Sequence, residues 1–469
     1  MKSIFFKNCD SISLGRSLIF KEEVLKKIFY ESLKKYRKLG RSSFHTPGHK
    51  GEMFKSQDLL SLDFTELPMT DSLYEASGII KRAEEALGYL CGAKKSLFSL
   101  GGNTLCIQTM LRLAAPTGGK ILCDRLVHRS AVSAMALLDI QPTWIKREFN
   151  EDSGLLEKIN LNEVKKNLAE DTNFKALYLT SPSYHGILQN IKLLSHECNK
   201  FNVPVLVDNA HGSHLIFVNK SLHPLNQGAS LVADSAHKTL PVLTGGAWLH
   251  INDERFIKSA KNAMALFGST SPSYVTMASM DICRAWLSKN GEKEYERLKQ
   301  RVDNIKNIAR GKGIFIPDNN LCDPVRITLG VWKIGVTGYE FREHLYKFKI
   351  EPEMCDENYV VLIPTPFNTK KDWRRLQNAL LAIEPKDEKV MNFKNFANYE
   401  LPNVKATLRE ALMAESVKVS LNKAKNRIAA EIICPCPPGV PVVMPGEKIG
   451  DFELEALAGY GISEILVLK

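Results

Sequence analysis

The chain has 469 residues, which is enough for about three domains of ordinary size, and its 44% hydrophobic and 25% charged content is typical of a globular protein. No apolar run is long enough to span a membrane, and the short apolar stretch near Met1 ends too early for a signal peptide, so we expect a cytoplasmic protein. The net charge is +11, but lysines alternate with glutamates and no basic block is interleaved with aromatic residues, which argues against nucleic-acid binding.

The cysteines give no sign of a metal site. All ten are scattered along the chain apart from Cys434 and Cys436, and neither a Cys-x-x-Cys pair nor a Cys/His zinc spacing occurs. We therefore expect free thiols in a reducing compartment and no metal ion.

Residues 1–43 are expected to form an arm and one amphipathic helix, Lys21 to Leu39, which Gly40 ends. A turn follows. In it His45 and His49 are four residues apart, a spacing that suits a metal pair on a helix, but the intervening Pro-Gly pair excludes the helix.

From about residue 78 to residue 250, short apolar runs alternate with helical patterns. The expected strands are Ser96 to Leu100, Lys120 to Cys123, Ala176 to Thr180, Val203 to Asp208, Leu231 to Asp234 and Ala247 to Ile251. The expected helices are Lys81 to Leu90, Thr104 to Ala114, Ser130 to Leu138, Leu161 to Leu168 and Leu193 to Phe201. This alternation predicts βαβ units around a mostly parallel sheet.

The rest of the chain reads as two smaller units. A charged helix, Gly291 to Arg310, is expected to lead into a second α/β domain, and a charged linker, Glu384 to Lys389, precedes the C-terminal region. The remaining expected elements are strands Val325 to Val331, Tyr359 to Ile363 and Ile465 to Leu468, with helices Gly338 to Lys347 and Lys371 to Ile383. We place the domains at residues 44–290, 291–385 and 386–469.

Two of these strands end in residues that suit pyridoxal phosphate. The run Val203 to Val207 ends at Asp208, and a later strand is followed by Lys238. A lysine amine can form a Schiff base with the cofactor aldehyde, and an acid can keep the pyridine nitrogen protonated. In open α/β sheets ligands lie beyond the carboxyl ends of the strands, so the two side chains are expected to share one edge.

Further polar residues follow the same strands. A Gly-Gly-Asn-Thr stretch ending in Asn103 and Thr104 opens a helix whose free N–H groups could hold a phosphate, although helix capping alone would also explain it. Ser235 and His237 add donors next to Lys238. His128 follows another strand and could stack on the pyridine ring, or be a structural histidine.

The donor-rich loop Phe267 to Ser273 is a weaker candidate. It could serve the phosphate of a neighbouring subunit, but an ordinary Ser/Thr turn is the favoured interpretation.

At these residues the chain resembles the Orn/Lys/Arg decarboxylase family. The motifs that carry the resemblance are His45 to Lys50, Asp124 to Ser130, Asp208 to Gly212, Ser235 to Lys238 and Pro437 to Glu447. The resemblance runs from about His45 to the C-terminus, and it implies a fold type I PLP-dependent transferase. Such a fold has a large domain with a mostly parallel seven-stranded sheet, a small α/β domain and a C-terminal α+β domain. The chain looks like a short form without the family's N-terminal wing domain.

The resemblance also implies roles for single residues. Lys238 would be the Schiff-base lysine, and Asp208 would pair with the ring nitrogen. Ala210 and His128 would pack on the two faces of the ring. The residues implied to hold the phosphate are Asn103, Thr104, Ser235 and His237. The phosphate loop departs from the common family pattern at Asn103.

The implied reaction is decarboxylation of arginine, lysine or ornithine to carbon dioxide and a diamine or agmatine, in polyamine biosynthesis. Lys238 or His237 would return the proton, and Glu447 would bind the distal cation of the substrate, unless it is a surface acid in a Pro-Gly turn. The resemblance implies a homodimer with the active site at the interface and leaves a higher oligomer open.

Two alternatives stay open from the sequence. An aminotransferase or lyase could use the same scaffold, with Arg326 as the clamp for the substrate carboxylate. A regulatory homologue without catalysis could also keep the fold, although the presence of Lys238, Asp208 and His128 argues against it.

Overall fold

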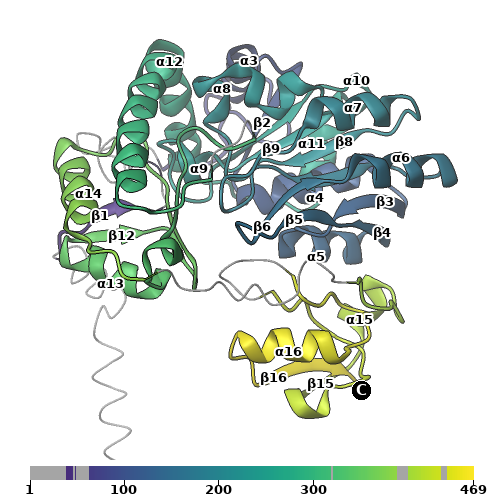
Figure 1. The fold of residues 1–469 in the computed structure, drawn as a ribbon. Coiled ribbons are helices and arrows are strands. Elements are labelled where there is room, and N and C mark those ends of the chain that lie inside the picture. Colours follow the sequence, from purple (N-terminus) through teal and green to yellow (C-terminus); the bar gives the residue numbers. More distant parts are fainter. Residues whose placement is uncertain (1–38, 46–47, 49–62, 318–320, 388–399, 435–440) are drawn as a thin grey trace, which may run out of the picture.

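A computed structural model describes residues 39–45, 48, 63–317, 321–387, 400–434 and 441–469 (Figure 1). Most of the expected arm helix, Lys21 to Leu39, lies outside the described residues, as do His49, Cys436 and the Pro-Pro-Gly that begins at Pro437. Among the residues described, no helix is both long and apolar enough to cross a membrane.

A seven-stranded sheet forms the centre of the largest body (Figure 1). Its strands, in spatial order, are β2 (Lys95–Ser99), β10 (Ala247–Ile251), β9 (Leu231–Asp234), β8 (Val205–Asp208), β7 (Leu177–Thr180), β3 (Gly119–Asp124) and β4 (Ile140–Ile145). All neighbours are parallel except β10, which runs antiparallel to β2 and β9. The expected mostly parallel sheet is confirmed.

Helices cover both faces of this sheet. They are α3 (Ile79–Cys91), α4 (Gly102–Ala114), α5 (Arg129–Leu137), α6 (Leu161–Glu170), α7 (Ile191–Asn199), α8 (Leu215–Val218), α10 (Glu254–Ile257) and α11 (Ala260–Ala265). The alternation of side chains along β8 explains the two layers, because Val205 and Val207 belong to one apolar cluster and Leu206 to another. Since both faces are buried, the strands read as continuous apolar runs in the sequence.

Two expectations about element boundaries were wrong or incomplete. Strand β4 was not expected, because its Pro142 disfavours a strand. It lies at the edge of the sheet, where a missing N–H is tolerated. The charged helix expected to begin at Gly291 is α12, which runs from Tyr274 to Gly311. Gly291 does not end this helix. A glycine is needed there because a Cβ at this position would lie within 2.9 Å of the Phe217 ring.

A second body surrounds a small antiparallel sheet of β11 (Ile327–Gly330), β14 (Tyr359–Leu362) and β13 (Met354–Cys355), with helices α13 (Gly338–Lys347) and α14 (Lys370–Ala382). Beside them, β1 (Ser42–Phe44) pairs in parallel with β12 (Ile350–Pro352). The boundaries predicted at residues 43/44 and 290/291 stay predictions; in the structure β1 adds a strand to this body, and α12 runs across the second boundary.

The C-terminal body contains the strand pair β15 (Ser416–Ser420) and β16 (Glu464–Leu468), and helices α15 (Leu408–Met413) and α16 (Asp451–Gly459) (Figure 1). It is anchored to the large body by shared core residues, since Leu408 and Met444 belong to the apolar cluster that includes α4 and α5. The β5 (Arg147–Asn150) and β6 (Leu155–Ile159) hairpin lies after β4.

Candidate active site

A large cavity opens beyond the carboxyl ends of the parallel strands. Its volume is about 1400 Å³, more than a drug-sized ligand needs. All three bodies contribute to its lining, which includes Asn103, Thr104, His128, Asp208, Ala210, His211, Ser235, His237, Lys238, Tyr339, Asp356, Glu431 and Tyr460. The residues that the sequence assigned to the cofactor are thus brought together, whereas Glu447, predicted to bind the substrate cation, does not line this cavity.

Lys238 lies on the short helix α9 (Ala236–Thr239), which follows β9 directly. Its Nζ is 3.0 Å from His211 Nε2. Burial lowers the pKa of the Lys238 ammonium, and the nearby Arg326 lowers it further, while Asp208 and Glu353 act in the opposite direction. A lysine in such surroundings loses its proton more easily than one in water, which favours a nucleophilic amine.

Asp208 ends β8 and is buried beneath the cavity. Its Oδ1 accepts hydrogen bonds from Asn103 Nδ2 at 2.7 Å and from the Ala210 N–H at 3.1 Å, and Tyr178 Oη donates to Oδ2 at 3.4 Å. Burial raises the pKa of the carboxyl to about 6, although Lys238 opposes the rise. A cation placed next to this carboxyl would favour its ionised form.

Asn103 was expected to hold a phosphate, and that role stays a prediction. In the structure its amide nitrogen donates to Asp208 Oδ1, so Asn103 orients the acid. The sequence signal for a phosphate ligand came only from its place at a helix start.

The start of α4 and the turn before Lys238 supply the other polar groups. Thr104 is exposed to the cavity in the first turn of α4. Ser235 Oγ is buried and has no hydrogen-bond partner within the described part of the chain. His237 Nδ1 lies 3.0 Å from the Gly246 carbonyl oxygen, which can only accept, so Nδ1 carries the proton.

His128 also lines the cavity and caps α5. Its Nδ1 accepts from the Ser130 N–H at 3.2 Å and lies 2.7 Å from Ser130 Oγ. Burial, and then Lys238, lower the pKa of the imidazole to about 4, so the ring is neutral at ordinary pH. A neutral, capped ring has a fixed orientation, which suits a flat contact with an aromatic ligand. Ala210 also lines the cavity.

The expected substrate contact of Glu447 does not fit its position. Glu447 is fully buried, and both carboxylate oxygens accept from the Arg125 guanidinium, at 2.5 and 2.8 Å. The Met444 N–H donates to the same carboxylate at 2.7 Å. A carboxylate that is already neutralised and sealed from the cavity cannot take up the cation of a substrate. The alternative interpretation as a surface acid is also wrong, and Glu447 is instead a tie between the C-terminal and large bodies.

Sequence reasoning missed three residues of the site. His211 lies inside a quoted motif but was given no role, Tyr178 is hidden in an apolar strand, and Tyr184 packs its ring 4.5 Å from that of His211. In the sequence, the only signal for any of the three was the position of His211 just past the end of a strand. Its contact with a lysine on another strand is a tertiary feature.

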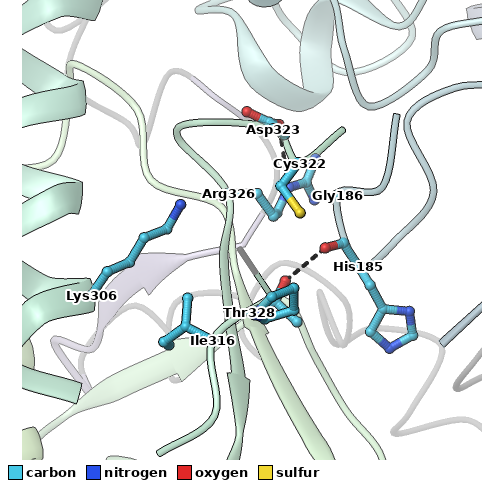
Figure 2. A pocket seen from close by; sticks show the side chains of 9 residues that line it. His185, Gly186, Lys306, Ile316, Cys322, Asp323, Arg326 and Thr328 are labelled. Carbon is cyan, nitrogen blue, oxygen red and sulfur yellow. Dashed lines mark hydrogen bonds and ion pairs between the residues drawn. The ribbon is translucent and has the colours of Figure 1, made fainter. Parts of the chain in front are cut away.

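Arg326, considered as a carboxylate clamp, is not among the residues that line the large cavity. It lines a separate small cavity of about 10 Å³ with Asp323 and Gly186 (Figure 2), a volume near that of a single water molecule. Its Nη2 donates to the His211 carbonyl at 3.1 Å. The loop Phe267 to Ser273 likewise lines neither cavity, and Ser273 caps α12, as expected of an ordinary turn.

The polar groups of the large cavity suit pyridoxal phosphate. The buried hydroxyl of Ser235 and the amide oxygen of Asn103 both lack partners among the described residues, so the cavity has hydrogen-bonding capacity that the described protein itself does not use. A nucleophilic lysine and a buried acid lie in the same space. Residues 208–210 and 235–238 would hold the group, with the start of α4 facing its phosphate.

Comparison with known proteins agrees with this arrangement. The family model "Orn/Lys/Arg decarboxylase, major domain" matches residues 28–316, and "Orn/Lys/Arg decarboxylase, C-terminal domain" matches residues 388–460. The chain belongs to the Orn/Lys/Arg decarboxylase family. It is therefore an amino acid decarboxylase, and the family expected from the sequence is confirmed.

Individual relatives cover nearly the whole chain. A Bacillus subtilis protein named uncharacterized protein YaaO is 32% identical over 92% of this chain and 93% of its own. The arginine decarboxylase of the same organism is 30% identical over 90% of each chain. The solved structure of the Escherichia coli constitutive lysine decarboxylase covers 99% of this chain and 85% of its own, with a TM-score of 0.73 and 21% identity, and shows the shared fold.

Proposed function

We propose that this decarboxylase uses pyridoxal phosphate and acts on a basic L-amino acid. The observation that carries the proposal is that Lys238 and Asp208, which follow different strands, line one cavity and influence each other's pKa. Family membership supplies the reaction class, and the acidic part of the cavity lining supports a cationic substrate.

When bound, pyridoxal phosphate supplies an aldehyde that amines attack and a cationic ring that accepts the electron pair released as carbon dioxide leaves. Asp208 would hold a negative charge against the ring nitrogen, since a neighbouring cation favours the carboxylate. Asn103 and the Ala210 N–H keep that carboxylate fixed through the bonds they donate to Oδ1. A carboxylate that is already held in position stabilises the charge of the transition state without any rearrangement of the surrounding protein.

The remaining residues would bind and orient. The N–H groups at the start of α4, with Thr104 and Ser235, would hold the phosphate. His237, whose Nδ1 proton is committed to the Gly246 carbonyl, could donate through Nε2 only as an imidazolium, which a phosphate dianion would favour. His128 and Ala210 would lie on the two sides of the ring. Lys238 would provide the amine that links to the cofactor and returns a proton to the substrate.

The distal cation of the substrate would meet carboxylates other than Glu447. Asp356 and Glu431 line the cavity from the small and C-terminal bodies. Asp356 Oδ1 accepts two backbone N–H groups, and its Oδ2 lies 3.6 Å from His185 Nε2. Glu431 is positioned by the Leu466 N–H, which donates to Oε1 at 2.8 Å. Each keeps at least part of its carboxylate for a ligand.

Arginine is the first substrate to test. Relatives named arginine decarboxylase are 26 to 30% identical over about nine tenths of this chain, whereas those named lysine decarboxylase are 22 to 24% identical. We also infer a homodimer, because Thr104 is exposed on a cavity to which a second subunit could contribute. Sedimentation at several concentrations tests the dimer.

The deciding experiment measures carbon dioxide from carboxyl-labelled arginine, lysine and ornithine, with and without added pyridoxal phosphate. We expect cofactor-dependent release from at least one substrate, no requirement for a keto acid, and loss of release in Lys238→Ala. Borohydride trapping followed by peptide mass analysis should find the cofactor on Lys238.

Two outcomes would contradict the proposal. Product formation that depends on a keto acid would indicate aminotransfer. Absence of trapped cofactor on Lys238 in protein purified with pyridoxal phosphate would support the regulatory alternative.

A further inference from the structure

His211 is a buried residue that none of the roles above uses. It lies just past the end of β8, close to Asp208 in the chain, and its side chain lines the large cavity. Its Nε2 is 3.0 Å from Lys238 Nζ, which is hydrogen-bond distance.

The ring is fixed in this position from several sides. Tyr184 packs against it with ring centroids 4.5 Å apart, and Arg326 Nη2 donates to the main-chain carbonyl of His211 at 3.1 Å. The other ring nitrogen, Nδ1, is buried and has no hydrogen-bond partner among the described residues. The Lys238 amine is therefore the one polar group that the described structure offers to this imidazole.

The charges around His211 keep it neutral at rest. Burial is the largest cause, and positive charge on Lys238 and Arg326 further disfavours a protonated ring. Burial first, and then Lys238, hold the pKa of the imidazole well below its usual value. Such a ring has a lone pair available for a proton, and the repulsion from Lys238 disappears once the lysine has given its proton up.

We propose that His211 is the base that takes the proton of Lys238 when the amine acts as a nucleophile. One N–H bond of the ammonium breaks, a bond from the same proton to His211 Nε2 forms, and the electron pair stays on Nζ. The positive charge moves from lysine to histidine, and the reverse transfer restores the resting state. This inference rests on the proposed function, since it assumes that Lys238 attacks an aldehyde.

The other acid–base groups near Lys238 are less suited. His237 has its Nδ1 committed to the Gly246 carbonyl, and no hydrogen bond between His237 and Lys238 is present among the described residues. The oxygens of Asp208 already accept from Asn103, Ala210 and Tyr178. A base must lie within reach of the proton that it removes, and His211 meets this condition.

The test follows attachment of pyridoxal phosphate to the cofactor-free protein, so that it does not depend on turnover. Samples are reduced with borohydride at successive times, and the labelled Lys238 peptide is quantified by mass spectrometry. The variants are His211→Ala and His211→Phe. The second keeps a ring next to Tyr184, and thermal unfolding checks that both variants are folded.

In both variants we expect the limiting rate of attachment at neutral pH to fall about a hundredfold, the typical contribution of a general base. Free imidazole should restore much of the rate in His211→Ala, where the deletion leaves room for it, but not in His211→Phe. His237→Ala is the matched control. It should raise the cofactor concentration needed for half-maximal attachment without becoming imidazole-dependent.

Two results would overturn the inference. One is attachment at the wild-type rate in His211→Ala, and the other is a slow rate that imidazole leaves unchanged, which would make the ring a structural support. Failure of the proposed function looks different, because the wild-type protein itself would then carry no label on Lys238.

Discussion

At the scale of single residues, partners from distant parts of the chain decide what each side chain does. Asn103 stands at a helix start, a place that suggests a phosphate ligand, yet its amide donates to the carboxylate of Asp208 at 2.7 Å. Glu447 carries a family motif, yet Arg125 takes up both of its oxygens. The residue types were identified from the sequence, but contacts between segments more than a hundred positions apart were not.

Ser235→Ala should weaken cofactor binding without weakening the fold. The Ser235 hydroxyl is buried and has no partner within the described chain, so its removal breaks no recorded internal hydrogen bond. We expect the dissociation constant of pyridoxal phosphate to rise by about tenfold, as for one lost bond to a charged group. Ser213→Ala is the control, since Ser213 Oγ is also buried and unpartnered there but does not line the cavity. Equal cofactor affinity in the two variants would contradict the assignment.

Asp208→Asn should make the cofactor-free protein more stable at high pH. The folded pKa of about 6 lies above the usual 3.8, so the folded state binds the proton more tightly and stability falls as pH rises between these values. Ionisation then costs about 3 kcal/mol above pH 6. Asparagine avoids this cost but cannot hold a cationic ring, so activity should fall at least a hundredfold, about 3 kcal/mol in activation free energy.

Thermal unfolding without cofactor at about pH 4.5 and about pH 8 measures the effect. Asp208→Asn should unfold at a higher temperature than the wild type only at the higher pH. An equal difference between the two proteins at both values would mean that the Asp208 carboxyl does not titrate in this range.

At the scale of elements, a buried polar network ties the ends of β8 and β9 together. Asn209 Nδ2 donates to Asp234 Oδ1 at 2.6 Å, and His223 Nε2 lies 3.1 Å from Asp234 Oδ2. His250 Nε2 is 3.4 Å from the same oxygen. Since Asn209 follows Asp208 and Asp234 precedes the Lys238 turn, the network holds the two proposed cofactor contacts in register.

Asp234→Asn should destabilise the large body by about 3 to 5 kcal/mol, because it removes the carboxylate shared by two buried histidines. The pKa of Asp234 is held below its usual value by those histidines despite burial. Its contribution to stability is therefore present above about pH 4 and is lost as pH falls through the folded pKa.

Urea unfolding at several acidic pH values measures the free energy of unfolding. In Asp234→Asn this free energy should not show the decrease below about pH 4 that is expected for the wild type. Asp253→Asn is the control, because Asp253 is a surface cap of α10. A variant as acid-sensitive as the wild type would show that Asp234 does not contribute in this way.

Element boundaries show why local patterns gave most of the fold but not all of it. The buried strands β8 and β9 are read from apolar runs because both of their faces are covered. Pro142 hid β4, since a proline is acceptable only at an edge, and the strand order is not visible in a sequence. Gly291 looked like a helix boundary but instead makes room for Phe217.

At the scale of the whole molecule, the C-terminal body is joined to the large body next to His128. Arg125 lies in the turn between β3 and the His128 cap, and its guanidinium forms the buried ion pair with Glu447. Neighbouring Asp124 is bonded to Arg147, so two ion pairs hold this turn. The C-terminal body therefore supports the wall of the cavity that His128 forms.

Glu447→Gln should destabilise the protein by about 3 to 5 kcal/mol, because Arg125 is left buried without a full counter-charge. Activity should fall by a similar factor for arginine, lysine and ornithine, since Glu447 does not touch the cavity. Glu453→Gln is the control, a buried acid that accepts from Gly450 within the C-terminal body. A changed preference among the three substrates would show instead that Glu447 contacts the distal cation.

The sequence by itself determined most of the elements, the two-sided burial of the central sheet and the family, and it predicted the lysine and the acid, because these depend on local periodicity and on motifs along the chain. Only the tertiary structure decided that Asn103 supports Asp208, that Glu447 ties two bodies together and that His211 meets Lys238. Those outcomes depend on which buried donors and acceptors come within about 3 Å of one another when different segments pack together in the fold. Buried polar groups need hydrogen-bond partners, and only the fold decides which partners are in reach.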